Sequence, residues 1–177
     1  MLSNITAGTS QQLQICIDEN IVDILVQLLQ HDEVVVQNEA VWALSNTTAS
    51  ANAEQFKTLT DKGIIKALGS TLISKDVRML AVALEGLDNI LDCGQKNYID
   101  DGGENMFALI TEREGILDYL EELQQHPNHD IYTSALQIIE KYFQTEEEGH
   151  PLMSALDNAI GQAAGSTPAQ GKGLFDL

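Results

Sequence analysis

Two stretches of the chain repeat one another without a gap: QLQICIDENIVDILVQLLQHDEVVVQNEAVWALSN at residues 12–46 and QFKTLTDKGIIKALGSTLISKDVRMLAVALEGLDN at residues 55–89. The offset of 43 aligns apolar positions, such as Leu44 with Leu87. It also aligns Asn46 with Asn89. Self-similarity at a period of roughly 20–50 residues is typical of solenoids, in which each unit buries its apolar face against the next.

The repetition continues on both sides of this pair. Upstream, residues 2–7 match residues 44–49 at an offset of 42, and downstream, residues 115–120 match residues 63–68 at an offset of 52. The extra spacing falls within residues 95–105, which contain a Gly-Gly pair and predict an enlarged loop.

Each unit has the pattern of three helices. In the first, residues 11–19 predict a short helix, Asn20 ends it, and residues 21–29 carry apolar residues on one face of a second helix. A turn at residues 31–33 precedes a third helix over residues 34–49. Three helices in 42–43 residues is the armadillo period. The sequence therefore predicts an all-α fold, an armadillo-repeat right-handed α-solenoid of about three repeats plus the end of a preceding one.

The expected organisation is a repeat region at 1–148 and a disordered carboxyl-terminal tail at 149–177. The repeat region divides into 1–8 (partial), 9–50, 51–94 and 105–145. Because the first residues have the pattern of the end of a helix whose beginning is missing, we expect the chain to be a fragment of a longer protein.

Charge restricts the partners. Among 177 residues there are 27 Asp plus Glu against 9 Lys plus Arg, a formal charge of -18. This balance argues against binding nucleic acid or an anionic membrane surface, and it favours a basic partner. Cys16 and Cys93 lie in apolar helical patterns, so we expect them to be buried and reduced. No membrane span or signal peptide is predicted, which favours an intracellular protein.

The sequence carries none of the common catalytic motifs. The sequence has no Gly-rich phosphate loop, nucleophile elbow or Cys-x-x-Cys pair. The four histidines fall in predicted turns or in the tail, and His126, His129 and Asp130 make only a weak metal corner. We expect no catalysis, no metal and no cofactor.

The best candidate for a binding site is the run from Glu39 to Asn46 in the first complete third helix. Trp42 and Asn46 are four residues apart and share a helix face, with Glu39 one turn earlier. Asn4, Asn46 and Asn89 occupy one repeat position, so their amides would form a ladder along one surface. The alternative is a Trp42 buried between repeats, with the Asn as a helix cap.

Such a ladder has the chemistry to hold an extended basic peptide. An amide both donates to and accepts from a peptide backbone. Trp42 offers a flat wall for a Lys or Arg stem, and Glu39 can meet the cationic head.

These residues resemble importin-alpha. The resemblance rests on LSNITAG at 2–8, NEAVWALSN at 38–46, IEKYF at 139–143 and the acidic run at 146–148, and it covers residues 1 to about 148 of this chain. It implies the carboxyl-terminal armadillo repeats of that family, whose third helices bind nuclear localisation signals of cargo through Trp and Asn side chains.

Carried over by position, the resemblance assigns the minor-site pattern to Asn4, Glu39, Trp42 and Asn46, with Ser3 flanking and Asn89 keeping the amide. This sequence departs from the pattern twice. The Trp that would precede Asn4 by four residues falls before Met1, and Glu85 stands where the next Trp would be.

The resemblance further implies a recycling exportin bound by residues 105–148, shuttling between cytoplasm and nucleus, and recruitment of importin-beta only if an amino-terminal segment absent from this chain exists. An armadillo scaffold of the catenin kind, binding other extended partners, remains an alternative, although catenin grooves are typically basic. A second alternative, weaker still, is a clathrin-box peptide at residues 174–177.

Overall fold

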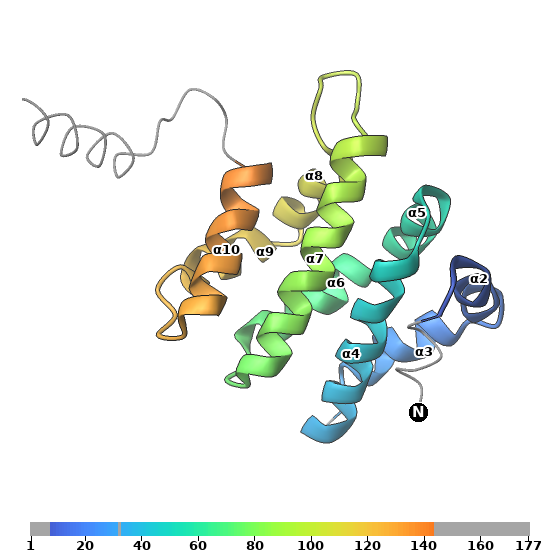
Figure 1. The fold of residues 1–177 in the computed structure, drawn as a ribbon, viewed down its shortest axis with the longest axis horizontal. Helices are drawn as coiled ribbons and strands as arrows, with labels where there is room; N and C mark the ends of the chain where they lie inside the picture. The colour runs from blue at the N-terminus through green and yellow to red at the C-terminus, as the bar shows by residue number, and fades with distance from the viewer. Residues whose placement is uncertain (1–7, 32, 144–177) are drawn as a thin grey trace, which may run out of the picture. The chain divides into compact units, whose positions relative to one another are not determined.

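The computed structural model describes residues 8–31 and 33–143, and within them the chain forms three successive groups of helices (Figure 1). The first group is α2 (Ser10–Asp18), α3 (Ile21–Leu28) and α4 (Val34–Ser50). The second is α5 (Ala53–Asp61), α6 (Ile64–Gly69) with the 3₁₀ turn η1 (Ser70–Ile73), and α7 (Val77–Asn97). The third is α8 (Met106–Arg113), α9 (Ile116–Leu123) and α10 (His129–Tyr142). The all-α prediction is confirmed for these residues.

Local sequence explains where the first helices begin. The Thr9 hydroxyl accepts from the Gln12 backbone N–H, and the Gln12 side chain accepts from the Thr9 N–H, which is a capping box. Asn52 and Gln55 form the same arrangement at the start of α5. The repeat therefore extends to the chemistry of the helix caps.

A left-handed residue separates the first helix from the second in every group. Asn20, Gly63 and Gly115 have φ values of 55°, 84° and 71°, and they occupy the same repeat position. Positive φ suits Gly because it lacks a Cβ, and Asn tolerates it better than most residues. The predicted break at Asn20 is confirmed, and it turns the chain from α2 into α3.

The third helices α4, α7 and α10 lie side by side in that order (Figure 1). The core between groups is mostly aliphatic, and α7 supplies its centre through fully buried leucine and isoleucine side chains. Its largest contributions are Leu80, Leu84, Leu87, Ile90 and Leu91. Cys16 and Cys93 are both buried and unpaired, as predicted.

The enlarged loop is present but starts later than expected, because α7 continues through Asn97. The Asn97 amide donates to the Cys93 carbonyl, and Lys96 pairs with Asp92, so the last turn is stabilised by its own side chains. The loop is fixed at both ends: the Tyr98 hydroxyl donates to the Ala53 carbonyl at 2.6 Å, and Asn105 is buried.

Two expectations concern residues outside the described ranges. They are the partial repeat at 1–8, of which only Gly8 is described, and the disordered tail at 149–177. None of the helices in the described ranges is both long enough and apolar enough to cross a membrane.

Candidate peptide-binding site

The candidate site is the third-helix surface, which we define as the outward side chains of α4, α7 and α10. Trp42 lies on it with 46% of its surface exposed, while Val41, Ala43 and Leu44 around it on α4 are fully buried. Helical periodicity explains this, because residues on either side of Trp42 turn toward the core and leave the indole outside. The alternative of a Trp42 buried in the core is wrong.

Glu39 is exposed one turn before Trp42, and Asn46 is half-buried one turn after it. A carboxylate, an indole and an amide therefore follow one another along α4, within the reach of one extended segment. Ser3 and Asn4, the other predicted members, lie outside the described residues, so the structure leaves their part of the site untested.

Asn89 has a structural contact that the sequence did not reveal. Its Nδ2 donates to the Thr48 hydroxyl at 3.1 Å, which connects α7 to α4. Thr48 is buried and donates in turn to the Ser45 carbonyl. Asn89 is half-buried. One of its two amide protons is thus committed to the contact between repeats, which leaves the second proton and the carbonyl oxygen for an incoming peptide.

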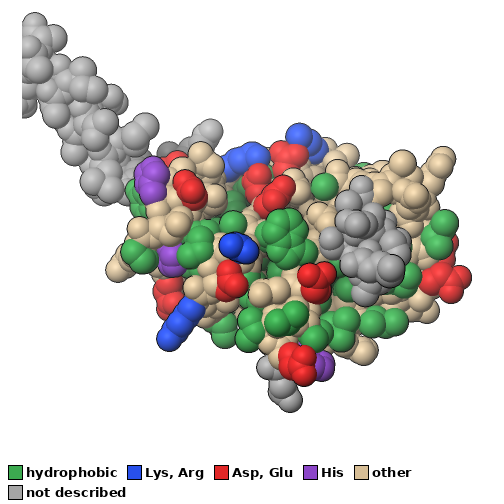
Figure 2. Space-filling view, turned by 60° about the horizontal axis from the view of Figure 1, so that its bottom comes forward, with side chains coloured by type: hydrophobic (Ala, Val, Ile, Leu, Met, Phe, Trp, Pro, Cys, Tyr) green, Lys and Arg blue, Asp and Glu red, His purple; other side chains and the backbone are tan. Residues whose placement is uncertain are grey.

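Acidic side chains accompany this array. On α7, Glu85 is exposed at the position that Trp42 holds on α4, and Asp88 and Asp92 follow it along the helix. Figure 2 shows one face of the molecule on which acidic side chains outnumber basic ones, with apolar side chains between them. The exposed Glu39 and Glu85 carboxylates and the Trp42 indole make the third-helix surface chemically suited to cations with aliphatic stems.

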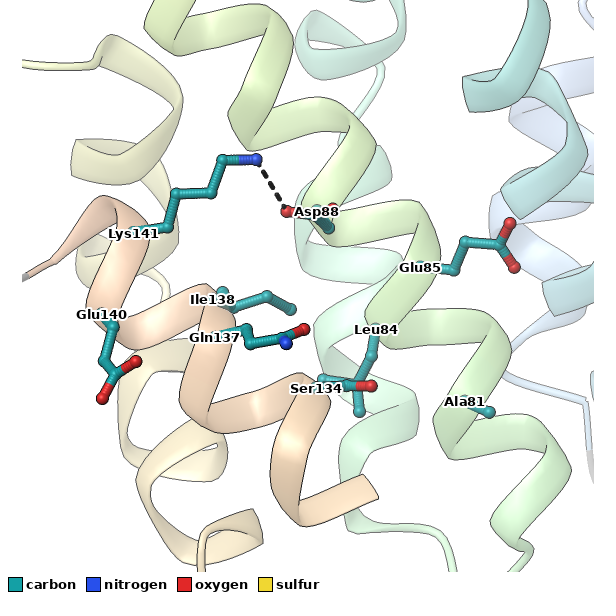
Figure 3. Close-up of a pocket in the computed structure, with 9 residues that line it drawn as sticks. All are labelled: Ala81, Leu84, Glu85, Asp88, Ser134, Gln137, Ile138, Glu140 and Lys141. Atoms are coloured by element: carbon teal, nitrogen blue, oxygen red, sulfur yellow. Dashed lines mark ion pairs between the residues drawn. The ribbon is translucent and has the colours of Figure 1, made fainter. Parts of the chain in front are cut away.

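A groove of about 560 Å³ runs between α7 and α10 (Figure 3). Leu84 and Ile138 form its buried apolar floor. Ser134 and Gln137 line it from α10. Figure 3 shows Glu85 pointing away from α10 and Glu140 pointing away from α7, whereas Asp88 and Lys141 approach each other across the groove.

Lys141 bridges the two helices at one end of this groove. Its Nζ lies 3.6 Å from an Asp88 oxygen and 3.3 Å from an Asp92 oxygen. The neighbouring Tyr142 hydroxyl donates to the Asp88 carboxylate at 2.8 Å. Burial, and next the Asp88 carboxylate, raise the pKa of Tyr142 well above its ordinary value, so the phenol remains a donor.

Asp92 pairs with two lysines, Lys96 and Lys141. A hydrogen bond from Lys96 is the main cause that lowers the pKa of Asp92, and Lys141 adds to it, while burial acts in the opposite direction. Asp92 is therefore charged at neutral pH. Sequence reasoning missed the roles of Asp88, Asp92 and Lys141, because only the packing of α10 on α7 brings them together.

Two of the histidines in the described residues, His126 and His129, make contacts within the fold. The His126 Nδ1 accepts from the Asn128 backbone N–H at 3.1 Å, and the His129 ring stacks on Tyr132. Residues 8–31 and 33–143 contain no group of His, Cys, Asp and Glu side chains arranged to hold a metal ion.

Both the sequence and the fold of this chain are similar to those of known proteins. Residues 9–49 match the family described as Armadillo/beta-catenin-like repeat, and residues 105–156 match the Atypical Arm repeat. Among solved structures, a designed armadillo repeat protein superposes with a TM-score of 0.64 at 28% identity, covering 78% of this chain and 54% of that one. A second, designed and solved in complex with the peptide (KR)4, has a TM-score of 0.50 at 24% identity over 80% of this chain and 72% of its own, and supports the fold alone.

Curated relatives give a more specific result. Importin subunit alpha-4 of Arabidopsis thaliana is 40% identical over 98% of this chain and 33% of its own length. Importin subunit alpha-1a of Oryza sativa subsp. japonica is 41% identical over 97% of this chain and 41% of its own length. The chain thus spans about a third of the length of such relatives. With armadillo repeats in its sequence, an armadillo solenoid as its fold and these relatives over nearly all its residues, the chain belongs to the importin-alpha family.

Proposed function

We propose that the chain binds extended, basic segments of other proteins along its third-helix surface. The observation that carries this proposal is the exposed indole of Trp42 on α4, with the Glu39 carboxylate one turn before it and the Asn46 amide one turn after it. Packing of the core does not explain why a half-exposed Trp42 lies between a carboxylate and an amide on one helix face.

Each side chain would contact a different part of the peptide. The face of Trp42 takes the aliphatic stem and cationic head of a Lys or Arg, a contact of ~0.5–2 kcal/mol. Glu39 pairs with the head, and the amides of Asn46 and Asn89 contact the peptide backbone, which makes that contact independent of sequence. Selection for basic residues therefore comes from Glu39 and Trp42.

The charge of the whole chain favours the same class of partner. At a formal charge of -18 the chain attracts cationic segments over distances of a Debye length, which raises the rate of association at low salt. Glu85 on α7 continues the acidic character into the next repeat.

Within the importin-alpha family, this activity corresponds to an adaptor for nuclear import that binds the nuclear localisation signals of cargo proteins. We propose this role for the chain, together with the recycling exportin as a partner of residues 105–148 and shuttling between cytoplasm and nucleus. The role is non-catalytic. The whole relatives are about three times longer than this chain. We propose importin-beta as a partner only of a longer chain that carries an additional amino-terminal segment.

The test is a titration of fluorescently labelled (KR)4 into the chain at low ionic strength, with acidic and uncharged peptides of equal length alongside. Binding of the basic peptide alone is expected, with affinity that falls as salt rises. Glu39→Gln should weaken it about two- to fivefold, the size of an exposed ion pair. Glu122→Gln makes the same charge change at an exposed position on α9, outside the third-helix surface, and should leave affinity unchanged. Equal binding of all three peptides would contradict the proposal.

A further inference from the structure

The last third helix carries a lysine where the two before it carry asparagine. Gly115 aligns with Gly63 at an offset of 52, and the N-caps of α10 and α7, Asn128 and Asp76, show the same offset. At this offset Lys141 on α10 takes the position of Asn89 on α7. The amide ladder therefore ends in a positive charge.

The Lys141 side chain reaches back to α7, although about half of it is exposed. Its ammonium lies between the Asp88 and Asp92 carboxylates, at 3.6 Å and 3.3 Å, and 4.7 Å from the centre of the Tyr142 ring. Two carboxylates and an aromatic face are the surroundings that a bound Lys or Arg of a peptide would seek. The position is already occupied, by a cation that belongs to the chain.

We propose that Lys141 is an internal competitor and a specificity-determining residue. It occupies the cation site formed by Asp88 and Asp92 at the end of the α7–α10 groove, and a Lys or Arg of a basic peptide binds there only by displacing it. This inference rests on the proposed function, whose peptide it extends from α4 toward α10.

The geometry of Lys141 makes it displaceable. Lys141 donates one hydrogen bond to Asp92 at 3.3 Å, and both ion pairs are longer than the ~2.7–2.9 Å of a strong charge-assisted hydrogen bond. The Lys141 and Asp88 side chains are about half exposed, at 50% and 46%. Such pairs contribute little to stability. An Arg from a peptide can instead donate two parallel hydrogen bonds to one carboxylate, a geometry that a lysine cannot offer. Its stem would lie over Leu84 and Ile138 on the groove floor.

One peptide can reach both sites. Adjacent helices pack about 8–10 Å apart, so the path from α4 across α7 to the groove is about 15 Å. The eight residues of (KR)4 extend over about 26 Å in a β conformation. A peptide seated on Trp42 therefore has residues left to enter the α7–α10 groove.

The test is a titration of labelled (KR)4 at low ionic strength into the wild-type chain and Lys141→Gln. The variant removes the Lys141 ammonium from both carboxylates, while Lys96 still pairs with Asp92 and Tyr142 still donates to Asp88. It should bind about two- to fivefold more tightly, a gain that fades as salt rises. Lys57→Gln on α5 is the matched control, since it removes the same charge from an exposed ion pair on another helix, and it should leave affinity unchanged. Asp88→Asn added to Lys141→Gln should abolish the gain, because an Asn can still accept from Tyr142 but carries no charge.

The outcomes separate this inference from the proposed function. A Lys141→Gln variant that binds no more tightly than wild type, or a gain equal to that of Lys57→Gln, overturns the inference, even where Trp42→Ala weakens binding. The inference is supported if Lys141→Gln alone gains affinity for (KR)4 and Asp88→Asn removes that gain. This holds even if Trp42→Ala has no effect, a result that would contradict peptide binding to α4. Absence of (KR)4 binding by every variant overturns both.

Discussion

Asn105 should be the most important polar side chain of the enlarged loop, and its replacement by Ala tests how the loop is held. The residue is 5% exposed. Its Oδ1 accepts from the Phe107 and Ala108 backbone N–H groups at 3.0 and 3.3 Å, which caps α8, and its Nδ2 donates to the Leu91 carbonyl at 2.9 Å. Asn105→Ala removes all three hydrogen bonds.

The magnitude follows from these contacts. Loss of an N-cap costs ~1 kcal/mol, and loss of a further buried hydrogen bond costs about as much again, so the free energy of unfolding should fall by about 2 kcal/mol. Asn128→Ala is the matched comparison, because Asn128 caps α10 by the same two bonds and no third one from its side chain is described. It should cost about 1 kcal/mol.

Urea unfolding followed by circular dichroism measures both variants against wild type. Thermal melts should show the same order, at about 2–4 °C per kcal/mol for a chain of this size. An Asn105→Ala variant no less stable than Asn128→Ala would refute the reasoning, because the bond to Leu91 on α7 would then contribute nothing.

Three further changes have definite expectations. Gln55→Ala should cost about 2–3 kcal/mol in urea unfolding, since Gln55 is buried and its amide bonds twice to Ser10 on α2, across the boundary between two helix groups. Leu87→Ala should cost about 2–5 kcal/mol as a large-to-small change at a fully buried position. The pKa of Asp92 is lowered in the folded chain, so its contribution to stability is complete above its ordinary value of 3.8 and is lost as pH falls through the folded value. The stability advantage of wild type over Asp92→Asn should therefore be present at pH 7 and shrink below about pH 4, and an advantage that persists in acid would contradict the assignment.

The order of helices could be predicted from the sequence because their causes are local. Apolar periodicity predicted the helices, and Asn20 predicted the break between the first and second helices of the first unit, where the structure has left-handed backbone. The observed bounds of α2 and α4 differ from the expected 11–19 and 34–49 by one residue at most. The end of α7 was misplaced by three residues, because side-chain bonds within its last turn extend it.

The candidate site could be predicted only in part. Helical spacing places Glu39 and Trp42 on one face, but it does not say how much of the indole is covered, and the structure leaves 46% exposed. The partners of Asn89 and Lys141 depend on how neighbouring third helices pack, since Thr48 and Asp88 lie 41 and 53 residues away in sequence. The partner of a long polar side chain depends on which groups the packing brings near it, and the repeat pattern of the sequence does not give that information.

The central claim is that the third-helix surface of α4 binds basic peptides through Trp42. The most direct measurement is the affinity of labelled (KR)4 for Trp42→Ala, with Tyr119→Ala on α9 as an aromatic control of moderate exposure, and a urea unfolding curve for each variant. The account predicts that Trp42→Ala weakens binding by ~1–2 kcal/mol, about 5- to 30-fold, that Asn46→Ala weakens it similarly, and that Tyr119→Ala leaves it unchanged. Because about half of the indole is covered, the stability loss of Trp42→Ala should stay at ~1–2 kcal/mol, below the ~3–5 kcal/mol of a buried aromatic. Unchanged affinity of Trp42→Ala for (KR)4, with a large loss of stability, would contradict the account.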